Sequence, residues 1–156
     1  MHPKGSFLLV CCVVLFATLA FSFHRSKQPV ATEPWTPAQL ESPQDLANII
    51  NDPKAKQPII LCVGPGAIIK GSIDIGPTKD SANLAKLKQR LDHLPKDADI
   101  VIYCGCCPFE HCPNIRPAFT LLNQMTFTRQ KLLNLEHNVK TDWINKGYPV
   151  TPIQGR

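Results

Sequence analysis

The sequence predicts an α/β domain with a mainly parallel central sheet flanked by helices. Two continuous apolar runs, 58–63 and 99–103, have the pattern of strands that are buried on both faces. Segments with helical spacing of apolar residues follow each run, at 84–94 and 118–125. Strands that alternate with helices indicate parallel β-α-β units, in which reactive loops lie at the carboxyl ends of the strands.

A short helix precedes the first of these strands. Ser42 offers an N-cap oxygen, Pro43 fits the first helical turn, and Asp45 complements the positive end of the helix dipole. The pair Asp52–Pro53 predicts the end of this helix, because the residue before a proline disfavours helical geometry. A Gly-Pro-Gly turn at 64–66 then ends the strand that follows.

Three further elements complete the predicted domain. Pro95 ends the helix at 84–94. The segment 131–135 has the pattern of a short strand. A last helical turn around 142–144 closes at Gly147, which suits the left-handed position after a helix.

The first 23 residues are a separate apolar leader. Lys4 precedes an apolar stretch over 7–23, and this arrangement predicts export to the periplasm or the exterior. Small residues permit cleavage after Ser22, so the leader is a signal peptide in one interpretation. The positive charges at 24–27 also suit an uncleaved anchor, which would associate the protein with a membrane through 7–23.

The remaining chain divides into three parts. We expect a linker over 24–34, one domain over 35–150 and a short tail over 151–156. The chain is 44% hydrophobic and 19% charged, which is enough apolar material for one real core. Its net charge of +5 comes from scattered side chains without interleaved aromatic residues, so we expect no nucleic-acid partner.

Four of the seven cysteines lie in one loop between the strand 99–103 and the next helix: Cys104, Cys106, Cys107 and Cys112. Pro117 suits the first turn of that helix. A thiol near a helix start faces unpaired N–H groups and the positive end of the dipole, which favour the nucleophilic thiolate. The loop is therefore the candidate reaction site, and Cys104 is the candidate nucleophile because it directly follows the strand.

Separated segments of the chain resemble, in order, the rhodanese (sulfurtransferase) domain. The matching segments are Trp35 with Ser42–Leu46 at its opening, Ile59–Val63 at its first central strand, Ile69–Ile73 at its glycine-histidine-isoleucine motif, Ile100–Cys104 at the strand that ends in its nucleophilic cysteine, and Trp143–Val150 at its closing segment. The chain departs from the family in its long loop, which has eleven residues between Cys104 and Arg116.

The resemblance implies a three-layer domain over 35–150 and sulfur transfer through a cysteine persulfide without a cofactor. Cys104 would be the nucleophile, and Arg116 would stabilise the anionic donor and the persulfide. The implied partners are a small anionic or persulfide sulfur donor and a thiol acceptor. Cys106, Cys107 and Cys112 would be resolving or relay thiols.

The residues themselves leave other chemistries open. Cys104 and Cys107 form a C-x-x-C pair, which is typical of thiol-disulfide redox proteins. The four loop cysteines with His111 also offer ligands for zinc or copper in a non-catalytic module. A disulfide-braced, inert loop is a further alternative. We expect Cys62, outside the loop, to be a buried strand residue.

Overall fold

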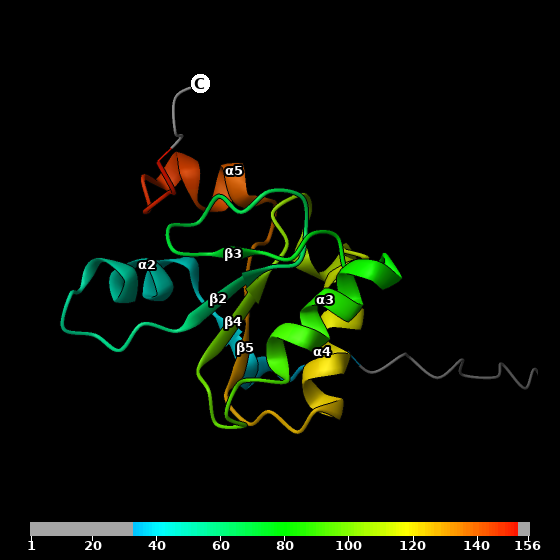
Figure 1. The fold of residues 1–156 in the computed structure, drawn as a ribbon. Helices are drawn as coiled ribbons and strands as arrows, with labels where there is room; N and C mark the ends of the chain where they lie inside the picture. The colour runs from blue at the N-terminus through cyan, green and yellow to red at the C-terminus, as the bar shows by residue number, and fades with distance from the viewer. Residues whose placement is uncertain (1–32, 153–156) are drawn as a thin grey trace, which may run out of the picture. The chain divides into compact units, whose positions relative to one another are not determined.

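A five-stranded parallel sheet forms the centre of the computed structural model, which describes residues 33–152 (Figure 1). The strands are β1 (Leu40–Glu41), β2 (Ile59–Cys62), β3 (Ile73–Asp74), β4 (Ile100–Tyr103) and β5 (Gln130–Leu133). Their spatial order is β1-β5-β4-β2-β3, and all four pairings are parallel. The predicted leader, most of the linker and the end of the tail lie outside the described residues.

Helices cover both faces of this sheet. The helices are α2 (Pro43–Asn51), α3 (Ser81–Leu91), α4 (Ile115–Gln124) and α5 (Val139–Asp142), and the 3-10 turns are η1 (Pro37–Gln39), η2 (Phe109–His111) and η3 (Ile144–Lys146). Apolar residues of α3 and α4 share one core, while those of α2 and α5 share the other (Figure 1). This three-layer arrangement confirms the predicted fold class.

Alternation along β4 decides which layer each of its side chains meets. All four residues of the strand are buried. Val101 and Tyr103 belong to the core with α2 and α5, whereas Ile102 and then Cys104 belong to the core with α3 and α4. Cys62 pairs with Tyr103 across the sheet and is fully buried in the opposite core from Cys104, as expected of a strand residue.

The Tyr103 hydroxyl organises the chain that crosses the carboxyl ends of the strands. It accepts the backbone N–H groups of Ile68 and Ile69, at 3.0 and 3.2 Å, and it lies 3.0 Å from Ser72 Oγ. Ile69 also forms an isolated antiparallel bridge with Val150. Buried polar groups need such partners, so this set of hydrogen bonds holds the segment 64–72 beside the sheet.

The helix boundaries differ from the sequence prediction in three places. The last helical turn, expected around 142–144, is α5 at Val139–Asp142, and η3 follows at Ile144–Lys146. The helix expected to reach Leu94 ends at Leu91, and the Leu94 N–H instead donates to Leu91 O in a tight turn before Pro95. The helix expected after Pro117 begins at Ile115. Pro117 is therefore the third helical residue, still within the first turn, where its missing N–H costs nothing.

Within the part of the chain that the structure describes, none of the helices combines the length and the apolar character needed to cross a membrane.

The short helix α2 has the cap that its sequence predicts. Ser42 Oγ accepts the N–H of Asp45 at 3.0 Å, and Pro43 is the first helical residue.

Trp143 gives a test of how the carboxyl-terminal segment is held. Its ring is fully buried, lies edge-on to Tyr148 at 5.3 Å, and donates from Nε1 to Pro149 O at 2.8 Å. We expect Trp143→Ala to lower the free energy of unfolding by about 3–5 kcal/mol, because it leaves a large cavity. The neighbouring Ile144 is 41% exposed, so Ile144→Ala should change stability by less than about 0.5 kcal/mol. Urea denaturation of the full-length proteins measures both changes, and equal losses would contradict this assignment.

Candidate active site

Cys104 lies at the carboxyl end of β4, the middle strand of the five-stranded sheet. Its side chain is almost fully buried, with 1% exposure. The turn after β2 passes directly against it, so closely that a Cβ atom on Gly64 would lie 2.4 Å from Cys104 Sγ. Glycine is therefore required at position 64 if the thiol is to keep this place.

The long loop after Cys104 folds back onto the domain. Phe109 is its anchor: the ring is buried at 6.0 Å from the Trp35 ring, and the backbone N–H donates to Leu135 O at 3.1 Å. A second tie joins the start of the loop to α5, because Val139 N–H donates to Gly105 O at 3.0 Å. These contacts return the chain toward its starting point and place Cys112 beside Cys104.

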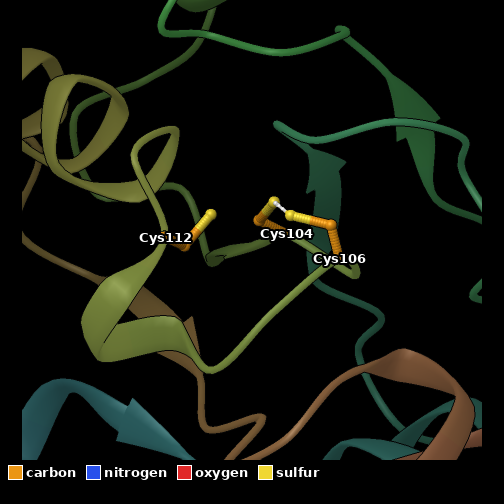
Figure 2. A group of neighbouring side chains, drawn as sticks. All are labelled: Cys104, Cys106 and Cys112. Carbon is orange, nitrogen blue, oxygen red and sulfur yellow. Dashed lines mark hydrogen bonds between the residues drawn. The ribbon is translucent and has the colours of Figure 1, made fainter.

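Three thiols meet as a result. We call Cys104, Cys106 and Cys112 the thiol cluster, since their Sγ atoms all lie within 4.8 Å of one another. Cys104 Sγ and Cys106 Sγ are 3.3 Å apart, and Cys112 points toward Cys104 from the other side (Figure 2). Cys104 and Cys112 are buried, while Cys106 is exposed. All cysteines of the described residues are free thiols.

Asn114 supports the cluster from the start of α4. It occupies the N-cap position, yet its side chain makes no capping bond and instead donates from Nδ2 to Cys104 Sγ at 3.4 Å. The loop before α3 fixes its position: Lys79 N–H donates to Asn114 Oδ1 at 3.1 Å, and Thr78 Oγ1 donates to the Asn114 carbonyl at 2.5 Å. A buried amide is thus held with its donor aimed at the thiol.

These surroundings favour a thiolate at Cys104. The polarised S–H of Cys112 has the largest effect; burial opposes it, and the backbone N–H of Cys106 and the Asn114 amide add to it. Together they lower the pKa of Cys104 from 9.0 to about 5. Burial and hydrogen bonding to its two thiol neighbours raise the pKa of Cys106 to about 12. The neighbouring Cys104 sulfur, and then burial, raise the pKa of Cys112. Cys104 is therefore the thiol of the cluster that ionises first.

Other residues chosen from the sequence lie outside the cluster. Cys107 Sγ is 3.2 Å from Cys106 Sγ, and no hydrogen bond among the described residues joins it to Cys104. His111 is exposed in η2 and does not belong to the group of neighbouring ligand atoms. Of the five possible metal ligands, the structure thus brings three together.

Arg116 lies in the first turn of α4 and is engaged away from the thiols. Its guanidinium donates to Glu33 Oε1 at 2.5 Å and to Glu110 O at 2.7 Å, and it stacks over the Trp35 ring at 5.6 Å. The structure shows no hydrogen bond from Arg116 to Cys104. Its assignment as the anion-stabilising residue stays a prediction.

Sequence reasoning missed three residues of the site: Gly64, Phe109 and Asn114. Asn114 carried a usable signal, because asparagine directly before a helix is a typical N-cap, but nothing in the sequence shows that its side chain turns to a thiol. Phe109 is the one aromatic residue among the loop cysteines, and such a residue in a polar loop often marks a buried anchor.

No family model matches this chain, and no curated protein matches its sequence.

The charge at Cys104 predicts an acidic titration. A group with a lowered pKa is ionised above that pKa and loses its charge as the pH falls through it, so the thiolate should persist at neutral pH and disappear near pH 5. The ultraviolet absorbance of thiolates is recorded against pH for the reduced protein and for Cys104→Ser. The difference between the two curves is the titration of Cys104. A midpoint near 9.0, the ordinary value, would contradict the assignment.

Asn114→Asp tests the amide donor without changing the shape of the side chain. The substitution keeps an acceptor for Lys79 N–H but places a negative charge 3.4 Å from Cys104 Sγ, so the midpoint should rise by about 1–3 pH units. The control Gln124→Glu adds the same charge at an exposed position on the same helix and should leave the midpoint unchanged. An unshifted midpoint in Asn114→Asp would show that the amide does not stabilise the thiolate.

Proposed function

We propose that the protein is a rhodanese-like sulfurtransferase in which Cys104 carries sulfane sulfur as a persulfide. The parallel α/β sheet and the cysteine cluster are compatible with that fold. One observation carries the proposal: a buried thiol at the carboxyl end of the middle strand accepts a hydrogen bond from the Asn114 amide and lies 3.3 Å from a second thiol, surroundings that lower its pKa. A thiolate is the nucleophile that sulfur transfer requires.

The first step loads the sulfur. The Cys104 thiolate attacks the outer sulfur of a donor persulfide, R–S–SH. A bond forms between Cys104 Sγ and that sulfur, the donor S–S bond breaks, and R–S⁻ leaves with the bonding electron pair. The Asn114 amide, which donates to Cys104 Sγ, is the group placed to hydrogen-bond the new persulfide.

The second step passes the sulfur outward, and Cys106 is suited to receive it. Its Sγ lies 3.3 Å from Cys104 Sγ, and the residue is exposed. Attack by Cys106 on the outer sulfur moves the persulfide to Cys106, while the Cys106 proton goes to the departing Cys104 sulfur. An acceptor thiolate can then attack the same outer sulfur at the surface; the S–S bond to Cys106 breaks, and Cys106 leaves as a thiolate that takes up a proton from water.

The donor class follows from what surrounds the thiol. Thiosulfate carries two negative charges and needs a cationic cradle, but Arg116 is neutralised by Glu33 and points to the Glu110 carbonyl. The thiolate itself is held by an amide, a backbone N–H and neutral thiols. We therefore propose that a protein-bound or low-molecular-weight persulfide is a better donor than thiosulfate.

Thiol-disulfide exchange is the second candidate, and the structure changes the pair that would carry it. Cys104 and Cys106 have their sulfur atoms 3.3 Å apart, whereas Cys107 contacts Cys106. A redox reaction would therefore oxidise Cys104 and Cys106 to a disulfide with transfer of two electrons to a partner disulfide, in place of the Cys104–Cys107 pair expected from the sequence.

A single-turnover assay tests sulfur transfer. The reduced full-length protein is mixed with a low-molecular-weight persulfide that carries a labelled outer sulfur, and intact mass and peptide mapping locate the label. Loading should occur at Cys104, be lost in Cys104→Ser because a hydroxyl is a far weaker nucleophile, and persist in Cys106→Ser, Cys107→Ser and Cys112→Ser. Turnover with a thiol acceptor should fall most in Cys106→Ser.

Two outcomes would refute this assignment. If Cys104→Ser is still fully loaded with labelled sulfur, another thiol is the nucleophile. Formation of a Cys104–Cys106 disulfide with no retained label would favour the redox function.

A further inference from the structure

The thiol cluster has the composition of a soft-metal site, a property that sulfur transfer does not require. All three ligand atoms are sulfur, and no carboxylate or imidazole of the described residues joins them. We propose that Cys104, Cys106 and Cys112 bind one Cu(I) ion through three thiolates. This inference goes beyond the proposed function and does not depend on it.

The spacing of the sulfur atoms fits one ion. Three sulfur atoms in a plane, each about 2.3 Å from a central metal, lie about 4 Å from one another. In the structure, Cys104 Sγ and Cys106 Sγ are 3.3 Å apart, and no pair in the cluster exceeds 4.8 Å. The ideal spacing falls between these values, so small side-chain rotations complete the site.

The number of ligands favours copper over zinc. Structural zinc sites are closed by four protein ligands. Here Cys107 and His111 are near in the sequence but lie outside the group, so the described residues provide three. Cu(I) is a soft ion that thiolate ligands select. Three sulfur ligands without hard donors therefore match Cu(I) better than zinc.

The site is held in place before metal binds. Cys104 follows a fully buried strand, and Cys112 belongs to a loop that the buried Phe109 ring anchors. Cys106 is the exposed member, so one of the three ligands lies at the surface. Ligands that are positioned before binding hold a metal without rearrangement of the chain.

Binding of Cu(I) and loading of sulfur exclude each other, since both use the Cys104 sulfur. The ion must displace the protons of Cys106 and Cys112, which pass to solvent, because a metal-bound sulfur is a thiolate. While Cu(I) is bound, Cys104 therefore cannot react with a persulfide.

Competition for Cu(I) tests the proposal. The reduced full-length protein is titrated, without oxygen, into Cu(I) held by a coloured chelator, and loss of colour reports transfer. We expect one Cu(I) per chain and an X-ray absorption spectrum with three sulfur neighbours. Cys106→Ser and Cys112→Ser should each weaken binding by at least roughly 100-fold, since each removes a ligand. Cys107→Ser is the matched control and should bind as the unchanged protein does.

The variants keep the result interpretable. Cys106 is exposed, so Cys106→Ser reports on the ligand even if Cys112→Ser, at a buried position, unfolds. Three results would overturn the three-thiolate site. Cys106→Ser could bind Cu(I) as tightly as the unchanged protein, or Cys107→Ser could lose as much Cu(I) affinity as Cys106→Ser. The protein could also bind four-coordinate zinc more tightly than Cu(I). Sulfur loading of Cys106→Ser, measured in parallel, separates this failure from failure of the sulfurtransferase proposal.

Discussion

The burial of a charged sulfur atom at Cys104 is the constraint on which the rest of the site depends. Removal of the thiolate from water is costly, so the charge persists only where hydrogen-bond donors replace the solvent. The Asn114 amide donates to Cys104 Sγ at 3.4 Å, and the neighbouring Cys112 thiol and Cys106 N–H also lower the pKa of Cys104. All three belong to the loop or to the helix that it enters, and the loop must therefore return to the point where it began.

This return explains why so many residues separate Cys104 from α4. A tight loop can present only its own successive N–H groups to a thiolate. The longer loop inserts η2 and buries Phe109 against Trp35, and this turn brings Cys112 and Asn114 back to the thiol. The same path leaves Arg116 on the outer side, paired with Glu33. The residues between Cys104 and α4 thus surround the Cys104 sulfur with thiols and an amide and leave the guanidinium outside the cluster.

Features that follow from a pattern of several residues were predicted from the sequence, whereas features that depend on one contact between distant residues were not. Buried strands such as 100–103 and the helix cap at Ser42 follow from patterns that span several residues, and the position of Cys104 follows from the strand before it. The two-residue strands β1 and β3 are too short for any periodicity. The use of Asn114 depends on Thr78 and Lys79, which are remote in sequence, so no local pattern reveals it.

In the thiol cluster, the thiol with the lowest pKa and the thiol exposed to solvent are different residues. Cys106 reaches solvent and has the raised pKa, whereas Cys104, with the lowered pKa, is buried beside it. Since Cys104 is only 1% exposed, a reagent must be small to reach its sulfur, and the terminal sulfur of a persulfide or a single metal ion meets that requirement.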